Sequence, residues 1–449
     1  MSDTLMRSVS GVRGIVGSDL TADVVSRYAA AFGALVAAGD RRPVVLARDS
    51  RASGPLFAEA ARGALCAAGV DVVDCGLVPT PTAQLAVEHH RAAGGIIVTA
   101  SHNPVEWNAL KFVGADGLFL DAETVRRLFD LVDAGKPEPA AGPGGAVATD
   151  PEAVARHLDG VLALSYVDAG RIAARRLTVV LDCVRGAGGV IMPRLLERLG
   201  CRVIGMDLEP DGAFPRAPEP VPENLGALGS AVRDAGADLG MAVDPDGDRM
   251  ALVDETGCAI GEDYTLALAA QAVLERKVGP VAANLSTSLV VDDVARAFGV
   301  EVVRAPVGEA HVARAMQRVA AVVGGEGNGG VMLPDLHLGR DAPVAAALIL
   351  DLLARSDRLV RGLVEARPRY TIVKARAPRG GDLEAAYAAL EGQLAGAAAD
   401  RQDGLRLGWP DRWLHVRPSG TEPIVRLIAE APTREGAQEL VAVARALLS

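Results

Sequence analysis

The sequence predicts an α/β protein that is divided into several domains. Short β-rich runs alternate with alanine-rich stretches through about residue 360, which is the pattern of βαβ units with parallel sheet. A chain of 449 residues is too long for one ordinary core and, at about 100 to 200 residues per domain, should hold about three or four. From Tyr370 onward the pattern changes to that of a small α+β domain.

Short apolar runs predict six strands before residue 360, at residues 43–47, 95–99, 177–182, 238–244, 281–285 and 320–324. Residues 21–38 and 56–68 are predicted to be helices, and each is followed by a glycine suited to a left-handed C-terminal cap, Gly39 and Gly69. In the last part of the chain we expect strands at 370–375, 413–418 and 423–430, and helices at 383–398 and 435–448.

Changes in composition indicate where the domains end. The segment from Gly135 to Asp150 is rich in proline and glycine, which is typical of a linker or an exposed loop and predicts a boundary near residue 155. Two further boundaries are expected near Thr256 and Arg367. The predicted domains are therefore residues 1–155, 156–256, 257–367 and 368–449.

Charge and composition exclude several classes of protein. The formal net charge of −11 argues against a nucleic-acid binder, because affinity for a phosphate backbone comes from a surplus of Lys and Arg. The five cysteines show no CxxC spacing, so neither a disulfide framework nor a zinc site is indicated. No apolar stretch reaches the roughly 18 residues of a membrane span. We expect a cytoplasmic protein whose anionic ligands are held in a local basic pocket.

One predicted strand ends abruptly in the polar stretch TASHNP, at residues 99–104. Loops at strand ends carry the chemistry of open α/β sheets, so Ser101 is a candidate nucleophile, phosphate ligand or helix cap. Arg13 and Lys111 are cations in apolar or glycine-rich surroundings. Each alone suits a surface position, but near a shared cleft each could stabilise phosphoryl oxygens or serve in proton transfer.

Three aspartates alternate in the loop DPDGDR, which follows another predicted strand and ends on Arg249: they are Asp244, Asp246 and Asp248. Carboxylates this close repel one another unless a cation neutralises them, and hard oxygen ligands favour Mg²⁺ or Ca²⁺ over zinc. An EF-hand is disfavoured because Arg249 stands where that loop needs glycine. A phosphatase of the haloacid dehalogenase type and a plain acidic turn remain alternatives.

Two further loops carry groups suited to a sugar and to a phosphate. In GGEGNGG, glycines let the backbone approach a ligand, and the carboxylate of Glu326 and the amide of Asn328 can bond to sugar hydroxyls. The loop RPSGTEP and the strand after it offer cations, hydroxyls and backbone to a phosphate: Arg417, Ser419, Gly420, Thr421 and Arg426. A glycine-rich turn and a plain surface turn are the alternatives.

The loops TASHNP, DPDGDR, GEGNGG and RPSGTEP, in this order, resemble those of the α-D-phosphohexomutase superfamily of phosphoglucosamine mutases, phosphomannomutases and phosphoglucomutases. The resemblance begins at SGVRG near the start and spans the chain. It implies three related α/β domains with mixed sheets and a C-terminal α+β domain around a central cleft. Because GEGNGG lacks the serine and histidine of the GExSGH found in many relatives, it is more similar to archaeal-type phosphoglucosamine mutases.

The resemblance also implies roles for single residues. Ser101 would be a phosphoserine that, together with the three aspartates Asp244, Asp246 and Asp248, holds one Mg²⁺ per chain. Glu326 and Asn328 would contact the sugar, and a clamp would grip the phosphate of the substrate: Arg417, Ser419, Gly420, Thr421 and Arg426. Four further residues would line the reacting centre, with the histidine or the lysine as general acid or base: Arg13, His102, Lys111 and Arg249.

The activity implied by the resemblance is that of a phosphosugar mutase. It would interconvert hexose 6-phosphate and hexose 1-phosphate through hexose 1,6-bisphosphate, an intermediate and activator, with glucosamine 6-phosphate as the expected substrate. Mannose or glucose phosphates are alternatives, and a metal-dependent sugar phosphatase is a further one. A non-catalytic sensor is disfavoured because the set of transfer residues is complete. We expect small phosphosugars as partners, no nucleic acid or membrane, and a monomer or homodimer.

Overall fold

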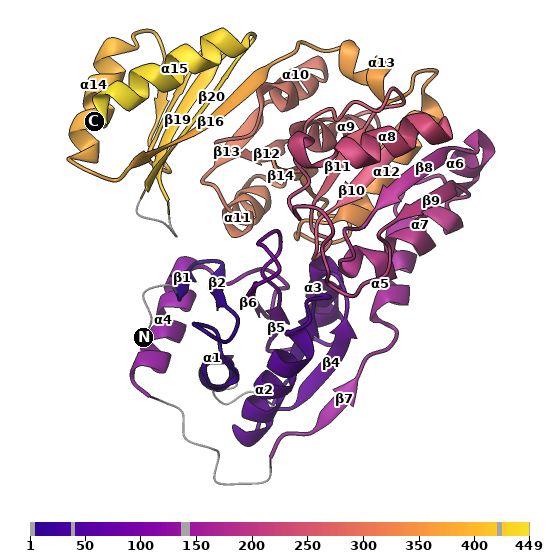
Figure 1. Ribbon diagram of the computed structural model, residues 1–449, viewed down its shortest axis with the longest axis vertical. Coiled ribbons are helices and arrows are strands. Elements are labelled where there is room, and N and C mark those ends of the chain that lie inside the picture. Colours follow the sequence, from indigo (N-terminus) through magenta and orange to yellow (C-terminus); the bar gives the residue numbers. More distant parts are fainter. Residues whose placement is uncertain (1–4, 37–40, 136–143, 420–423, 449) are drawn as a thin grey trace.

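The computed structural model shows four regions in chain order, each with its own β-sheet (Figure 1). The structure describes residues 5–36, 41–135, 144–419 and 424–448. The predicted architecture of three α/β domains with mixed sheets followed by an α+β domain is confirmed. Within these described residues, no helix is long and apolar enough to cross a membrane.

The first domain is a sheet of seven strands between two layers of helices. The strand order is β1-β2-β6-β5-β3-β4-β7, where β5, β3, β4 and β7 are parallel and the others join antiparallel. Its strands are β1 (Met6–Ser8), β2 (Gly11–Ile15), β3 (Val44–Arg48), β4 (Val72–Leu77), β5 (Gly94–Val98), β6 (Trp107–Gly114) and β7 (Val147–Thr149). Its helices are α1 (Ala22–Val36), α2 (Gly54–Ala67), α3 (Thr80–His89) and α4 (Ala122–Asp133).

Alternate side chains of the central strands pack against the two helical layers. Leu46 and Ile96 belong to one hydrophobic cluster with α1, α2 and α4, whereas Val45 and Ile97 belong to another with α3. Because both faces of these strands are buried, they read in the sequence as continuous apolar runs.

The second domain contains a sheet of order β11-β10-β8-β9 and the third one of order β13-β12-β14-β15. The second comprises α5 (Ala153–Leu162), α6 (Ala169–Arg175), β8 (Thr178–Asp182), α7 (Met192–Arg198), β9 (Arg202–Met206), α8 (Gly226–Ala235), β10 (Leu239–Val243) and β11 (Met250–Val253). The third comprises α9 (Asp263–Leu274), β12 (Val281–Asn284), α10 (Leu289–Ala297), β13 (Val302–Ala305), α11 (Glu309–Val319), β14 (Val323–Glu326), β15 (Gly330–Met332), α12 (Ala342–Arg355) and α13 (Val360–Glu365).

These two domains share one hydrophobic core. Leu181 and Met241 from the second domain and Val273 and Leu348 from the third lie in a single buried cluster. The helix α12 lies between them, and its first twelve residues are all buried. Apart from Asp351, which pairs with Arg276 and Arg355, these residues are apolar, so the helix is stable in this central position away from water.

The fourth domain is an antiparallel sheet of order β16-β20-β19-β18-β17 with two helices on one face (Figure 1). Its elements are β16 (Thr371–Pro378), α14 (Leu383–Gln393), β17 (Ala398–Asp400), β18 (Leu405–Gly408), β19 (Trp413–Pro418), β20 (Ile424–Ala431) and α15 (Arg434–Leu447). Alternate residues of β20, such as Val425 and Leu427, pack against α15, so Arg426 between them faces away from the helices.

The structure corrects several predicted elements. The strand expected at 320–324 is β14, which begins at Val323 because α11 continues to Val319 and a left-handed residue, Ala320, ends it. The helix expected at 383–398 ends at Gln393, and a second strand, β17, starts at Ala398. The expected linker between residues 135 and 150 includes the edge strand β7, which pairs with β4.

The first three domains share one local topology, which makes each of their sheets mixed. In each, a buried strand is followed by a loop and by a strand that returns antiparallel: β5 and β6, β10 and β11, and β14 and β15. The loops between them are the serine loop (residues 99–106), the aspartate loop (244–249) and the sugar loop (327–329, with Glu326 before it).

Backbone hydrogen bonds connect the aspartate loop to the start of α3 and the sugar loop to β11 of the second domain. Thr80 N in the first domain donates to Asp246 O at 2.8 Å, and Met250 N in the second donates to Gly329 O at 3.1 Å. Gly329 has a φ of 91°, and a Cβ there would lie 2.3 Å from Met250 O, so this approach requires glycine. The hydrogen bond from Ser101 Oγ to Asp244 at 3.0 Å adds the serine loop, so the fold brings three distant loops to one place.

Candidate active site

Ser101 lies in the serine loop directly after β5 and is buried. Its φ of 49° is left-handed, a conformation that costs energy in a residue with a Cβ. Its Oγ donates to Asp244 Oδ2 at 3.0 Å and accepts from Arg249 Nη2 at 3.2 Å. The hydroxyl therefore points at the aspartate loop of the second domain.

The buried guanidinium of Arg51 holds the serine loop in place. It donates to the carbonyl oxygens of Ser101 at 2.6 Å, Asn103 at 2.7 Å and Pro104 at 2.7 Å, and also to that of Trp107. Its Nε bonds to Asp49, whose other bonds include one from Thr99 Oγ1 at 2.7 Å. The carbonyl of Pro104 also accepts from Trp107 N at 3.1 Å, so Arg51 adds to the bonds that this segment makes by itself.

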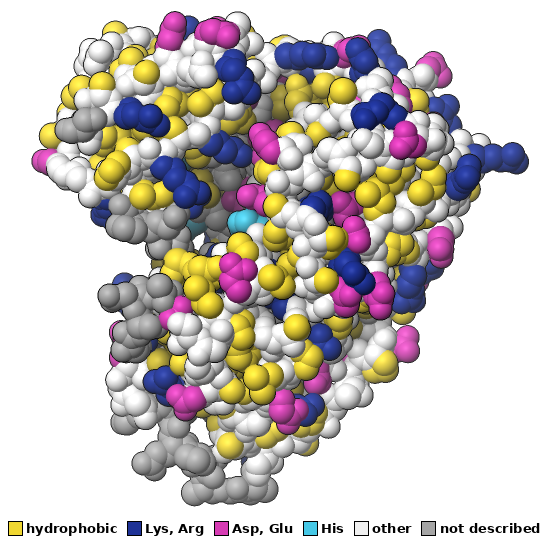
Figure 2. All heavy atoms as spheres, viewed as in Figure 1, with side chains coloured by type: hydrophobic (Ala, Val, Ile, Leu, Met, Phe, Trp, Pro, Cys, Tyr) yellow, Lys and Arg dark blue, Asp and Glu magenta, His cyan; other side chains and the backbone are white. Residues whose placement is uncertain are grey.

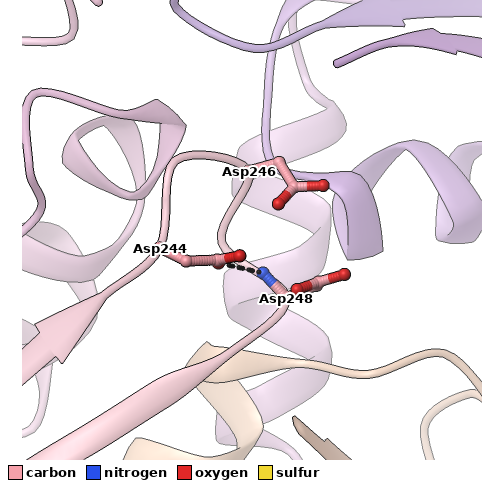
Figure 3. A group of neighbouring side chains, drawn as sticks. All are labelled: Asp244, Asp246 and Asp248. Carbon is pink, nitrogen blue, oxygen red and sulfur yellow. Dashed lines mark hydrogen bonds between the residues drawn. The ribbon is translucent and has the colours of Figure 1, made fainter. Parts of the chain in front are cut away.

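The aspartate loop brings three buried carboxylates together (Figure 3). One oxygen from each of Asp244, Asp246 and Asp248 lies within 4.8 Å of the others. Asp244 Oδ1 accepts from the amide nitrogens of Asp248 and Arg249, each at 3.2 Å. The backbone of the loop therefore orients Asp244, while the other two carboxylates depend on contacts from elsewhere.

Cations from the first and third domains contact this triad. Lys111 Nζ on β6 donates to Asp246 Oδ2 at 2.7 Å and lies 3.7 Å from Asp248 Oδ2. Arg340 of the third domain donates to Asp248 Oδ2 at 2.6 Å. Burial alone would lower the pKa of Lys111, but the carboxylates of Asp246 and Asp248 outweigh it and raise that pKa, so the lysine is charged at neutral pH.

The triad fits a divalent cation with hard oxygen ligands. The Oδ1 atoms of Asp246 and Asp248 are buried and have no hydrogen-bond partner within the described part of the chain. Burial, together with the charges of Asp248 and Asp246, raises the pKa of Asp244 well above its ordinary value. A divalent ion would use the orphaned oxygens and favour the ionised carboxylates, which is how Mg²⁺ is bound in proteins.

His102 and Arg13 also lie near the serine. His102 Nδ1 is 3.4 Å from Ser101 Oγ. Burial, reinforced by the charges of Arg249 and Arg13, lowers the pKa of His102 well below its ordinary value, so the imidazole is neutral at pH 7. Arg13 Nη1 donates to Asn103 Oδ1 at 2.9 Å, which places a cation beside the serine loop.

Glu326 lies at the end of β14, and both of its carboxylate oxygens accept hydrogen bonds from protein groups. Its Oε1 accepts from Asn284 Nδ2 at 2.8 Å and from Gly308 N at 2.9 Å, and its Oε2 pairs with Arg340 at 2.8 Å. Burial alone would raise the pKa of Glu326, but Arg340 and Asn284 lower it. The carboxylate is therefore ionised. Asn328 lies beside it and its Oδ1 accepts from Gly330 N at 3.2 Å.

The predicted phosphate residues lie in the fourth domain. Arg417 on β19 and Arg426 on β20 are directly paired in the antiparallel register, so their side chains share one face of the sheet. Ser419 is buried, and its amide donates to Ile424 O at 2.9 Å. Gly420 and Thr421 lie outside the described residues. Figure 2 shows the surface hollowed between the fourth domain and the first, with histidine and acidic side chains in view there.

Four consecutive segments match the phosphoglucomutase/phosphomannomutase family. Residues 5–138, 155–257 and 261–370 match its alpha/beta/alpha domains I, II and III, and residues 372–447 match its C-terminal domain. The chain belongs to this family. It is therefore a phosphohexomutase, an isomerase of phosphosugars.

Relatives agree on this activity but differ in the sugar that their names give. A phosphoglucomutase/phosphomannomutase of Thermococcus kodakarensis is 37% identical and covers 98% of this chain and 97% of its own. A probable phosphoglucosamine mutase of Methanopyrus kandleri is 38% identical and covers 96% of this chain and 95% of its own. The crystal structure of a family protein from Burkholderia thailandensis matches with a TM-score of 0.87 at 29% identity and covers 99% and 98% of the two chains.

Sequence reasoning missed four residues of this phosphohexomutase site. Thr80 Oγ1 donates to Asp246 Oδ2 at 2.8 Å, and Arg51, Asn284 and Arg340 hold the three loops as described above. Of these four, only Arg340 could have been found from its neighbours in the sequence. The stretch LGRD places it next to an aspartate, shortly after an apolar strand. The other three act across 42 to 166 positions of sequence.

Replacing Arg51 tests its role as the support of the serine loop. Arg51→Met removes the guanidinium that donates to four carbonyl groups, so we expect faster amide hydrogen exchange across residues 99–107 and a loss of about 3–5 kcal/mol in stability. Arg276→Met is the control, since it removes an arginine from buried Asp351 far from the loop. Equal exchange at residues 99–107 in both variants would contradict the assignment.

Proposed function

We propose that this phosphohexomutase interconverts glucosamine 6-phosphate and glucosamine 1-phosphate through phosphorylated Ser101 and a 1,6-bisphosphate. One observation carries the proposal: Ser101 Oγ faces a buried carboxylate triad and lies within 3.2 Å of Arg249. A serine in this setting suits the carriage of a phosphoryl group, because cations and a divalent ion offset its charge of about −1.5 to −2. The printed name of the Methanopyrus kandleri relative supports glucosamine as the sugar.

The reaction would consist of two transfers in opposite directions. In the first, a sugar hydroxyl attacks the phosphorus on Ser101, the bond to Oγ breaks, and the hydroxyl proton moves to a base. In the second, Oγ attacks the other phosphate of the bisphosphate, and the released sugar oxygen takes up a proton. The neutral imidazole of His102, with Nδ1 at 3.4 Å from Oγ, suits the role of this base and acid.

Charged residues would stabilise the transferring group. When bound by Ser101 and the three aspartates, Mg²⁺ supplies electrophilic stabilisation of the phosphoryl oxygens. Lys111 and Arg249 are charged and pair with carboxylates of the triad, and Arg13 bonds to Asn103 of the serine loop, so all three could stabilise a phosphoryl group on Ser101. Because Lys111 keeps its proton next to Asp246, it suits electrostatic stabilisation better than base catalysis.

The substrate would be held at two further places. Glu326, ionised and buried, can accept hydrogen bonds from sugar hydroxyls, with the amide of Asn328 beside it. The phosphate that is not transferred would be bound in the fourth domain by Arg417, Ser419, Gly420, Thr421 and Arg426. Separate holding of sugar and phosphate would allow the substrate to bind in either orientation.

Replacement of Ser101 tests the carrier role. We expect mass spectrometry of the purified protein to find partial phosphorylation on Ser101, and Ser101→Ala to lose about a thousandfold or more of its turnover while still binding substrate. Ser10→Ala, an exposed serine of the same domain, serves as the control and should keep full turnover. An unphosphorylated Ser101 together with an undiminished rate in the alanine variant would refute the mechanism.

Removal of the metal tests the triad. Chelation followed by dialysis should abolish turnover, and added Mg²⁺ should restore it. Calorimetry should show that Asp246→Ala binds Mg²⁺ at least tenfold more weakly, since a ligand is lost. Asp254→Ala, a buried aspartate in a turn of the same domain, should bind Mg²⁺ like the unaltered protein. A rate that survives dialysis would contradict the proposed metal site.

Comparison of substrates tests the choice of sugar. In coupled assays with a bisphosphate activator, we expect the highest kcat/KM for glucosamine phosphates and lower values for mannose and glucose phosphates. A higher value for mannose or glucose phosphates would assign the enzyme to the alternative activity. Release of inorganic phosphate in place of isomerisation would instead favour a phosphatase.

A further inference from the structure

The loop between β12 and α10 connects the third domain to the fourth. We call residues 284–289 the spacer loop. Arg304 Nη1 donates to the carbonyl oxygens of Asn284 and Thr287, each at 2.8 Å, and Asn284 Oδ1 accepts from Ser286 N at 2.9 Å. These bonds fix the path of the backbone. The loop can therefore hold groups of the third domain at a set distance from groups of the fourth.

On one side, the spacer loop bonds to the sugar loop. Asn284 Nδ2 donates to Glu326 Oε1 at 2.8 Å, and Gly327 N donates to Thr287 Oγ1 at 3.0 Å. Both partners are within the third domain. The position of the carboxylate of Glu326 is therefore tied to that of the spacer loop.

On the other side, the spacer loop bonds to the fourth domain. Ser286 Oγ lies 2.8 Å from Nδ1 of the fully buried His415. The Nε2 of His415 lies 2.7 Å from Asp403 O, which can only accept, so Nε2 carries the proton and Nδ1 accepts from Ser286. Burial lowers the pKa of His415 to about 4, which keeps this arrangement at neutral pH. Leu289 N adds a bond to Glu430 Oε2 at 2.8 Å.

His415 and Arg417 are two residues apart on β19, so their side chains lie on the same face of the sheet. Asp403 joins them, because its carbonyl accepts from His415 and its Oδ2 lies 2.8 Å from Arg417 Nε. Two consecutive amides of the third domain reach the same groups: Val307 N donates to Asp403 Oδ2 at 3.1 Å, and Gly308 N to Glu326 Oε1 at 2.9 Å. Two routes thus connect Glu326 with Arg417.

We propose that His415 is a positioning residue which, through Ser286, fixes the separation between the sugar-binding Glu326 and the phosphate-binding Arg417. The inference rests on the roles given to these two residues in the proposed function. A sugar phosphate has a fixed length. It therefore makes both sets of contacts only while the spacer loop keeps the third and fourth domains at the matching separation. Inorganic phosphate would contact the fourth domain alone, so its affinity would not depend on that separation.

The test measures binding of glucosamine 6-phosphate and of inorganic phosphate by calorimetry, in full-length protein with Ser101→Ala to prevent turnover. Ser286→Ala removes the donor, and His415→Gln keeps a donor near Nε2 while it loses the acceptor at Nδ1. Each variant should lower the affinity for the sugar phosphate about three- to tenfold, which is the range for the loss of one hydrogen bond. The affinity for inorganic phosphate should change by no more than about twofold. The double variant should be no weaker than either single variant.

Two further variants separate positioning from damage to the fold. His415→Asn keeps an acceptor near Nδ1 and should restore most of the affinity for the sugar phosphate. Tyr370→Phe removes another hydrogen bond at the same domain junction, 2.8 Å long to Asp293, and should change neither affinity. The proposal would be overturned if Ser286→Ala bound the sugar phosphate with unchanged affinity. It would also be overturned if the affinities for both ligands fell by the same factor.

The role of Arg417 is tested separately. Arg417→Gln should weaken both ligands, because it removes a cation from the phosphate site itself. If Arg417→Gln binds both ligands as tightly as the protein with Arg417, the phosphate site of the proposed function is wrong. If both weaken there but Ser286→Ala and His415→Gln bind the sugar phosphate normally, the positioning proposal alone fails.

Discussion

The site depends on one electrostatic constraint, which is the burial of three carboxylates in a single loop. An unpaired buried charge costs several kcal/mol, so Asp244, Asp246 and Asp248 are compatible with folding only if cations reach them. Lys111 comes from the first domain and Arg340 from the third. Because no single domain supplies these partners, the aspartate loop reaches its observed state only when the three α/β domains are packed together.

The same constraint couples the sugar loop to the three aspartates. Arg340 also pairs with Glu326 and with Glu309, so the group expected to bind the sugar and the triad share one guanidinium. Glu309 in turn accepts from Gln84 of the first domain at 3.0 Å. The serine loop is held separately by Arg51, which compensates for the strained backbone at Ser101. Chemistry and binding therefore rest on buried arginines that touch neither phosphate nor sugar in the proposed mechanism.

Much of the fold could be predicted from local pattern because the central strands are buried on both faces. Residues 95–99 and 238–244 read as apolar runs and correspond to β5 and β10. The return strands β11 and β15 are four and three residues long, too short for a periodic signal of their own, and their pairing depends on the strand before them. The motif loops were found because their residue types suit a specific chemistry, and the phosphohexomutase family that they suggested is confirmed.

By itself, the sequence determined the family and the order of the loops, and it indicated the residues that we expect to carry the chemistry, because those residues are clustered in short motifs. Tertiary structure alone decided which side chains support them. Arg51, Asn284 and His415 are ordinary residues in sequence, and each acquires its role from a partner that is distant along the chain. A buried hydrogen bond or ion pair depends on positions in space that only the packed domains define, so no local pattern contains it.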